Sequence, residues 1–184
     1  VLDHATSGRI EVSGQDVGRL SKGEAADFRL DNVGFIFQAY NLVPVLTAYE
    51  NAEFTLLLRG VPASERKARV MPLLDRVGLG DMKERKPHEL SGGQQQRIAV
   101  VRALATKPAI VLADEPTANV DQTNQEQIVE LIRKTCREEG VGLLMVTHSG
   151  DVASQFDRVD RLEEINLVKA TASSSKAANG KGEA

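Results

Sequence analysis

Residues 110–121 read IVLADEPTANVD, an apolar run that ends in two adjacent carboxylates, Asp114 and Glu115. Two other apolar runs, VGFIF at residues 33–37 and LLMV at residues 143–146, are likewise continuous rather than alternating. Continuous runs of this length are typical of strands that are buried on both faces of a parallel sheet. We therefore expect three strands of that kind.

Helical stretches lie between these runs. We expect helices at residues 47–59 after a turn at Pro44, at 62–77 with proline in the first turn, at 92–106 and at 121–138, and a weaker strand at 9–12. Because strands and helices alternate, the pattern predicts an α/β fold with a mostly parallel sheet flanked by helices.

The helical residues are unevenly distributed. Residues 47–80 are almost all helical and fall between two predicted strands of the sheet. We therefore predict a helical subdomain, at about residues 47–106, inserted into a domain that spans residues 1–169. The remaining sequence, ATASSSKAANGKGEA at residues 170–184, is small, polar and aperiodic, which predicts a disordered tail.

The composition narrows the class of protein. With 184 residues, 41% hydrophobic and 27% charged, the chain is typical of one soluble globular domain. Its formal net charge of −3 provides no overall basic field, so we expect no nucleic-acid partner.

The single cysteine, Cys136, cannot form an internal disulfide, which fits a reducing cytoplasm. We interpret it as a residue of a helix surface or of the core. The apolar runs are too short to span a bilayer, so a membrane role requires a partner.

Each predicted strand of the sheet is followed by a polar group. Gln38 comes directly after the first strand, Asp114 and Glu115 end the second, and His148 follows the third by one residue. Singly, such residues are more often turn residues or structural histidines. The carboxyl edge of an α/β sheet is where ligands bind, so three such positions on one edge predict a site.

Two adjacent carboxylates repel each other, and a cation relieves that repulsion. We assign Asp114 to magnesium, through water, and Glu115 to orienting or deprotonating the water that attacks a terminal phosphate. His148 would hold transition-state charge, and Gln38 would sense the metal or the water. The alternative is that both carboxylates only cap the turn before Pro116.

A second candidate site is LSGGQQQR at residues 90–97. Ser91 and Gln94 fit a capping box at the start of a helix. Capping does not explain Gly92 and Gly93, which cost about 1 kcal/mol each relative to alanine inside a helix. Glycines at this position allow an anion to approach bare amides. Arg97, one turn further along, either adds positive charge or pairs with a surface acid.

Together these motifs resemble the nucleotide-binding subunit of an ATP-binding-cassette (ABC) transporter. LSGGQQQR is similar to the family signature, IVLADE to the Walker B strand, Asn119–Asp121 to the D-loop, Gln38 to the Q-loop glutamine and His148 to the switch histidine. Order and spacing agree over about residues 9–168. Within the family, FIFQAYNLVPVLTAYEN and LADEPTANVD look most like the lipoprotein-release and macrolide-exporter group.

The resemblance implies a P-loop NTPase-like fold and an ATPase that uses ATP and Mg²⁺. It implies a head-to-tail dimer of two nucleotide-binding subunits, in which Ser91, Gly92, Gly93 and Gln94 of one copy close over ATP held by the other and Asp121 helps across the interface. It also implies that a coupling helix of a separate transmembrane permease docks near residues 40–48. The protein would then lie on the inner face of the cell membrane and power export or lipoprotein release.

The sequence departs from the family pattern at its start. The phosphate loop, G-x-x-x-x-G-K followed by Ser or Thr, occurs nowhere, and the only Gly-Lys pair, Gly180 and Lys181, is followed by Gly182. We expect that the chain begins after that loop, cannot cradle its own ATP and is inactive and poorly stable alone, because a missing interior strand exposes apolar edges.

Two smaller departures lie near the other end. Ser149 stands where an acid commonly follows the switch histidine, and Glu163, Glu164 and Ile165 replace an Asp-Gly-type hairpin turn. The last hairpin of the family is therefore not predicted for this chain.

Two other functions are compatible with these motifs. In the first, the chain is a degenerate, non-hydrolysing half that lends its Ser91–Gly93 loop to a complete partner. In the second, it is a soluble ATPase of the same superfamily that works on DNA or ribosomes, against which the acidic balance and the docking-like residues 40–48 argue. An in-frame phosphate loop upstream of Val1, or a neighbouring permease gene, would separate these possibilities.

Overall fold

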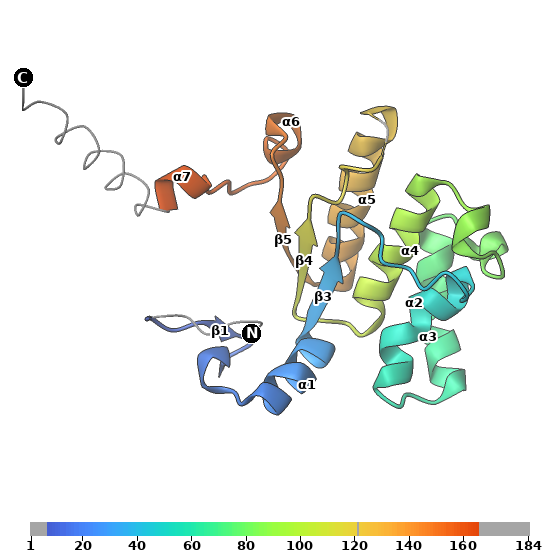
Figure 1. Cartoon of the computed structure of the whole chain (residues 1–184), viewed down its shortest axis with the longest axis horizontal. Coiled ribbons are helices and arrows are strands. Elements are labelled where there is room, and N and C mark those ends of the chain that lie inside the picture. Colours follow the sequence, from blue (N-terminus) through green and yellow to red (C-terminus); the bar gives the residue numbers. More distant parts are fainter. Residues whose placement is uncertain (1–6, 121, 166–184) are drawn as a thin grey trace, which may run out of the picture. The chain divides into compact units, whose positions relative to one another are not determined.

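A computed structural model describes residues 7–120 and 122–165 of the chain (Figure 1). The chain divides into two compact units, residues 1–148 and residues 149–184. The elements of the first unit are β1 (Glu11–Val12), β2 (Gln15–Asp16), α1 (Lys22–Asn32), β3 (Val33–Ile36), α2 (Ala48–Leu58), α3 (Ala63–Arg76), α4 (Gly92–Ala105), β4 (Ile110–Asp114), α5 (Gln122–Glu139) and β5 (Gly142–Val146). Short 3-10 helices span Val17–Arg19, Gly80–Met82 and Pro87–Glu89.

The main sheet has the order β3-β4-β5, and both of its strand pairs are parallel. Phe35 lies beside Leu112, which lies beside Leu144. A separate antiparallel pair joins β1 to β2. The predicted α/β fold with a mostly parallel sheet is confirmed. Strands β3, β4 and β5 each lie within one residue of the predicted range, whereas the weaker strand predicted at residues 9–12 is observed as the shorter β1.

Two apolar clusters form the core of the first unit. One cluster lies between α2, α3 and α4, and the other lies between the sheet, α4 and α5. Helix α4 contributes residues to both clusters. Ile98, Val101 and Ala105 belong to the first cluster, and Val100, Ala103 and Leu104 belong to the second. The helices of residues 48–105 thus pack around a cluster of their own, but because α4 belongs to both, the independence of a helical subdomain stays a prediction.

The ends of α2 and α4 follow from local hydrogen bonding. Thr47 accepts a hydrogen bond from the Glu50 amide, and Glu50 accepts one from the Thr47 amide, so both partners of a capping box are present. Ser91 and Gln94 form the same box at the start of α4. These caps explain why α2 and α4 begin within one residue of their predicted starts.

Helix α1 was not predicted from the sequence. Its residues are mostly polar, and only Ala25 and Phe28 are buried, so it lacks a continuous apolar stripe. A signal was nevertheless present, because Ser21 and Glu24 form a complete capping box ahead of it.

The prediction that the strands are buried on both faces is wrong. In β5, Leu143 and Met145 pack against the core, whereas Leu144 and Val146 are 57% and 59% exposed. The burial of β3 and β4 alternates in the same way. Among the described residues of the first unit, α4 and α5 pack on one face of the sheet only, which leaves the other face open.

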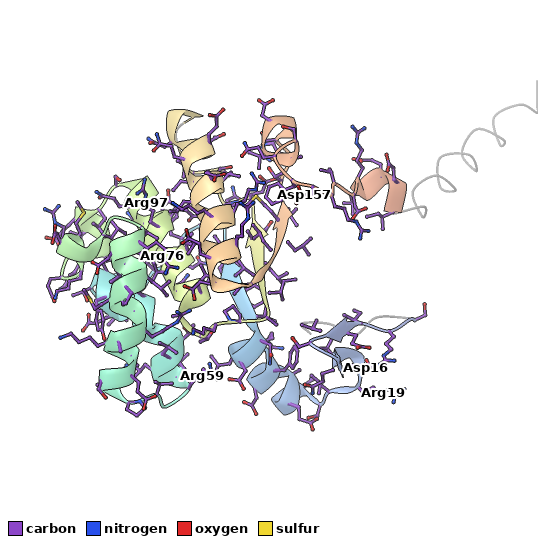
Figure 2. The ribbon with its side chains drawn as sticks, turned by 180° about the vertical axis from the view of Figure 1, so that it is seen from behind. Asp16, Arg19, Arg59, Arg76, Arg97 and Asp157 are labelled. Atoms are coloured by element: carbon purple, nitrogen blue, oxygen red, sulfur yellow. The ribbon has the colours of Figure 1, made fainter. Side chains whose placement is uncertain are left out.

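An ion-pair cluster joins α3 to the end of α5. Arg69 Nη2 and Arg76 Nη1 each lie 2.6 Å from a different carboxylate oxygen of Glu139 (Arg76 is labelled in Figure 2). Burial alone would raise the pKa of the Glu139 carboxyl, but the hydrogen bonds from both arginines outweigh it and hold that pKa below its usual value. These ion pairs therefore connect α3, which packs with α2 and α4, to α5, which packs against the sheet.

The described part of the second unit holds two short helices, α6 (Gly150–Ala153) and α7 (Leu162–Ile165). Ser149 caps α6 by accepting a hydrogen bond from the Val152 amide. Glu163, Glu164 and Ile165 lie in α7, so a helical turn stands where the family places a hairpin turn. The predicted disordered tail, residues 170–184, lies outside the described residues. In the ranges that the structure covers, no helix has the length and apolarity needed to cross a membrane.

Candidate functional site

Glu115 lies at the carboxyl edge of the sheet, directly after β4. Its backbone adopts φ +44°, a left-handed conformation that is uncommon for a residue other than glycine, and its amide donates to the carbonyl of Val146 at 3.0 Å. The amide bond keeps Glu115 beside the end of β5. Strained backbone of this kind is concentrated at functional sites.

The Glu115 carboxylate accepts hydrogen bonds from the segment that follows β5. Oε1 receives the backbone amide of His148 at 2.8 Å and lies 2.7 Å from Nδ1 of the same residue. Oε2 lies 3.4 Å from the Thr147 hydroxyl, which donates to it. Because an ionised carboxylate is only an acceptor, Nδ1 carries the hydrogen, and Nε2 is left for a second partner.

The two side chains differ in exposure. The Glu115 side chain is 19% exposed, whereas that of His148 is 82% exposed. The carboxylate is therefore held on the protein side of the pair, and the imidazole presents its far edge outward. The carboxylate makes no capping bond to the turn at Pro116 within the described residues, so the capping alternative is not what the structure shows for Glu115.

Asp114 and Gln38 share this edge but are not in contact with the pair. Asp114 is the last residue of β4, is exposed, and lies beside Val146 in the strand register. Gln38 lies two residues after β3, with an exposed side chain. Among the residues that the structure describes, neither side chain is hydrogen-bonded to Glu115 or His148. The four residues therefore follow the strands at the predicted edge of the sheet. Of the four, Glu115 and His148 are the two that are hydrogen-bonded to each other.

Asp114 is the carboxylate predicted to bind magnesium. Within the described residues there is no group of three or more His, Cys, Asp or Glu side chains that could hold a metal. Magnesium is commonly bound through one or two carboxylates together with phosphate oxygens and water. A single exposed carboxylate such as Asp114 fits that pattern.

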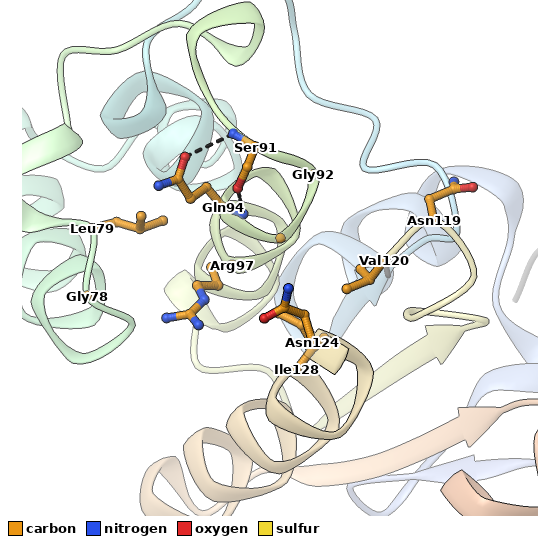
Figure 3. Close-up of a pocket in the computed structure, with 11 residues that line it drawn as sticks. Gly78, Leu79, Ser91, Gly92, Gln94, Arg97, Asn119, Val120, Asn124 and Ile128 are labelled. Atoms are coloured by element: carbon orange, nitrogen blue, oxygen red, sulfur yellow. Dashed lines mark hydrogen bonds between the residues drawn. The ribbon is translucent and has the colours of Figure 1, made fainter. Parts of the chain in front are cut away.

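A cleft of about 590 Å³ opens at the start of α4 (Figure 3). It is lined by Gly78, Leu79, Ser91, Gly92, Gly93, Gln94, Arg97, Asn119, Val120, Asn124 and Ile128. None of the four sheet-edge residues lines it, so the chain presents two separate candidate sites rather than one pocket.

The predicted capping box at this cleft is confirmed. The Ser91 hydroxyl accepts from the Gln94 amide at 3.3 Å, and the Gln94 side-chain oxygen accepts from the Ser91 amide at 2.9 Å (Figure 3). The two glycines differ from each other. A Cβ at Gly92 would lie 2.6 Å from the Tyr40 hydroxyl, whereas one at Gly93 would meet nothing within 4 Å. Gly93 thus leaves open space beside the helix start, as an approaching anion requires.

Arg97 does not pair with a surface acid among the described residues. Its Nη1 donates to the carbonyl of Val77 at 3.0 Å, and the guanidinium lines the cleft beside Gly78. Added positive charge at the cleft stays a prediction for Arg97. Asp121 lies outside the described residues, so its predicted role across an interface is untested.

Three residues of the predicted motifs make contacts at these sites that the sequence did not predict. Asn119 donates from Nδ2 to the Gln38 carbonyl at 2.9 Å and so links the two candidate sites. The Tyr40 hydroxyl donates to the Asn119 carbonyl at 2.9 Å. Gln96 is fully buried and donates to the Pro116 carbonyl at 2.8 Å, which fixes the turn after Glu115. Their partners lie 20 to 81 positions away in the sequence, beyond any local pattern.

Cys136 plays no part in this chemistry. It is a free, buried thiol in the core beneath the sheet, and burial raises its pKa to about 11. It therefore stays protonated and packs as a small apolar residue.

The sequence profile of the protein family described as "ABC transporter" matches residues 2–118. The chain belongs to the ABC transporter family. The fold is accordingly the α/β, P-loop NTPase-like fold of the ABC ATPase cassettes, and the family's members are ATPases.

Several relatives in this family are similar to the chain. The ABC transporter ATP-binding protein YtrE of Bacillus subtilis is 48% identical over 149 residues, which cover 81% of this chain and 64% of YtrE. The lipoprotein-releasing system ATP-binding protein LolD of Geobacter metallireducens is 42% identical over 167 residues, covering 91% of this chain and 74% of LolD. The macrolide export ATP-binding/permease protein MacB of Brucella abortus is 44% identical over 170 residues, covering 92% of this chain and 26% of MacB.

A solved ABC cassette has the same fold. The dimeric structure of a post-hydrolysis state of the ATP-binding cassette MJ0796, bound to ADP and Pi, superimposes with a TM-score of 0.70 and 39% sequence identity. The match covers 83% of this chain and 67% of that one.

Proposed function

We propose that this protein is the ATP-binding and ATP-hydrolysing subunit of a membrane transporter of the export or lipoprotein-release type. The observation that carries the proposal is the contact between Glu115 and His148 at the carboxyl edge of the sheet, beside Asp114. Similarity to LolD and MacB supports the transport class. A carboxylate fixed by an imidazole suits the activation of a water molecule near a phosphate.

In this proposal each edge residue has one role. Glu115 orients the attacking water and accepts its proton, while His148 holds the carboxylate through Nδ1 and turns Nε2 toward the terminal phosphate. Asp114 binds magnesium through water, and Gln38 contacts the metal or the attacking water. When bound, magnesium would neutralise charge on the phosphate oxygens.

The second candidate site, at the start of α4, would act on the other copy in a homodimer. Ser91, Gly92, Gly93 and Gln94 would contact ATP held by the partner, and Arg97 would add positive charge to that surface. Asp121 would help from the same side. The open position at Gly93 and the dimeric state of the MJ0796 cassette support this arrangement.

Residues 40–48 would receive a coupling helix of a separate permease, which would hold the protein at the inner face of the membrane. Buried Asn51 organises this loop: Oδ1 accepts from the Val43 amide, and Nδ2 donates to the carbonyls of Val43, Leu46 and Thr47. At the loop's tip, Val45 is 73% exposed. A fixed loop with an exposed apolar tip is suited to docking a partner helix.

A second function, a non-hydrolysing half that lends its signature loop to a complete partner, is compatible with one observation. The loop at Ser91–Gly93 is capped by the reciprocal hydrogen bonds of Ser91 and Gln94. The two functions differ in what they predict for this chain when a phosphate loop is restored.

The test uses the complemented cassette, which we define as this chain with a phosphate-loop segment of the family joined ahead of Val1. The chain as it stands should show no magnesium-dependent ATP hydrolysis, and the complemented cassette should hydrolyse ATP. In that cassette, Glu115→Gln should lower kcat by about a hundredfold or more while ATP binding and dimer formation persist. Exposed Glu84→Gln is the matched control and should leave kcat unchanged.

Two outcomes would contradict these assignments. Normal hydrolysis by Glu115→Gln would remove Glu115 from its assigned role. A folded complemented cassette that binds ATP without hydrolysing it would favour the non-hydrolysing half instead.

A further inference from the structure

Tyr40 and Asn119 connect two loops through a pair of hydrogen bonds. The Tyr40 hydroxyl donates to the backbone carbonyl of Asn119 at 2.9 Å. The Asn119 side chain donates from Nδ2 to the backbone carbonyl of Gln38, also at 2.9 Å. The loop after β3 and the loop after β4 are therefore joined in both directions, by one side chain from each.

The same hydroxyl also touches a third segment, the start of α4. A Cβ placed on Gly92 would lie 2.6 Å from the Tyr40 hydroxyl oxygen and 3.5 Å from the Asn119 carbonyl oxygen. The first distance is shorter than a real Cβ contact, so a methyl group at this position would have to displace the Tyr40 hydroxyl. The Tyr40 hydroxyl thus lies between Gly92 and Asn119 and fixes how closely they approach.

The backbone of Tyr40 is anchored independently of its hydroxyl. Arg102 of α4 donates to the carbonyl of Tyr40 at 2.9 Å and to that of Asn41 at 2.6 Å. Because these bonds hold the main chain, Tyr40→Phe should remove one hydrogen bond without moving the loop. The hydroxyl can therefore be tested apart from the fold.

We propose that Tyr40 is a positioning residue that sets the spacing between the Ser91–Gly93 loop and the segment formed by Asn119 and Val120. This inference rests on the proposed function, which assigns both segments of one copy to the nucleotide of the other copy. The Tyr40 hydroxyl is the group that contacts both segments. Its effect should accordingly be felt at the partner's active site and not at its own.

The first test is ATP hydrolysis by the complemented cassette. Tyr40→Phe should lower kcat about three- to tenfold, as expected for the loss of one positioning hydrogen bond, with little change in ATP binding by the separate subunit. The matched control is Tyr49→Phe. Tyr49 is the other tyrosine of the chain, and its hydroxyl contacts Glu53 on α2. That control should leave kcat unchanged.

The second test uses a covalently linked dimer in which one copy carries Glu115→Gln, so that a single site hydrolyses ATP. Tyr40→Phe placed in the Glu115→Gln copy should lower the rate about three- to tenfold, because that copy supplies its loops to the working site. Placed in the other copy, it should leave the rate near that of the parent. A role in folding alone would lower the rate equally in both arrangements and would overturn the inference.

A third test needs no activity and uses the chain as it stands. Gly92→Ala should lower the melting temperature, because its methyl group would displace the Tyr40 hydroxyl. The loss should be less than half as large when Tyr40→Phe is also present. Additive effects would show that the hydroxyl does not contact Gly92 and would overturn the inference.

The outcomes separate the inference from the proposed function. A parent complemented cassette that does not hydrolyse ATP refutes the proposed function, and the positioning role falls with it. A parent that hydrolyses ATP normally, with Tyr40→Phe indistinguishable from Tyr49→Phe, refutes the positioning role alone.

Discussion

His148 holds Glu115 by two atoms at once: its backbone amide and its Nδ1 both lie within 2.8 Å of the carboxylate oxygen Oε1. The amide bond depends on the path of the chain after β5, whereas the Nδ1 bond depends on the side chain. Removing the imidazole therefore leaves the carboxylate in place, held by the amide and by Thr147. This division makes the contribution of the imidazole measurable.

In the complemented cassette, His148→Ala should lower kcat about ten- to hundredfold, because one charge-assisted hydrogen bond and the outward-facing Nε2 are lost together. The melting temperature of the chain should change little, since His148 is 82% exposed. Exposed His88→Ala is the matched control. Equal kcat values for the two variants would exclude His148 from the reaction.

Glu139 is expected to contribute to stability in a pH-dependent way. Its folded-state pKa is lowered, so the stabilisation is fully present above the unfolded-state pKa and is lost as the pH falls through the folded-state pKa. Glu139→Gln should cost about 1–3 kcal/mol at neutral pH, because it leaves the partly buried Arg69 without a charged acceptor and Arg76 with the more distant Glu138 carboxylate. Acid titration of the melting temperature should show a smaller acid-induced loss for this variant than for the parent.

The neighbouring Glu138 provides the control for this experiment. Its carboxylate lies 3.5 Å from Arg76 Nε and is 41% exposed, so Glu138→Gln removes a solvated pair. Such pairs contribute about 0–1 kcal/mol. A loss of stability as large as that of Glu139→Gln would show that the buried geometry at Glu139 has no special role.

Much of the fold was predictable because the deciding signals are local. Continuous apolar runs marked the three strands, and the Ser91 and Gln94 capping box marked the start of α4. Sheet burial was not predictable, because the covered face depends on how many helices pack across it. The exposed Leu144 is as apolar as its buried-face neighbour Leu143, and the sequence alone does not distinguish them.

The sequence predicts that the candidate site lies at the carboxyl edge of the sheet, but it does not predict which side chains are in contact there. Gln38, Glu115 and His148 each follow a parallel strand, so they come to the same carboxyl edge of the sheet whatever the loop conformations are. The contact between Glu115 and His148 depends on the left-handed backbone at Glu115, which no residue type dictated. The bond from Tyr40 to Asn119 joins positions 79 residues apart and follows from tertiary packing alone.

Asn51 should determine the order of the loop at residues 43–47. Asn51→Asp keeps the shape and the acceptor for the Val43 amide but loses the three donor bonds of Nδ2 and buries a charge. We expect a loss of about 2–4 kcal/mol in the free energy of unfolding and faster hydrogen exchange across this loop. Exposed Asn41→Asp is the matched control, and an equal change in both variants would refute the assignment.

The open face of the sheet should govern self-association of the isolated chain. Leu144 and Val146 are more than half exposed on β5, and Phe37, just after β3, is 38% exposed. Contiguous exposed apolar surface promotes association in water. Leu144→Lys should therefore reduce concentration-dependent association and dye binding, measured by light scattering and by fluorescence of a hydrophobic probe, without lowering the melting temperature. Leu143→Lys, one residue away on the covered face, should instead unfold the chain, because it places a charge against the core. If both variants behaved alike, the burial pattern assigned to β5 would be incorrect.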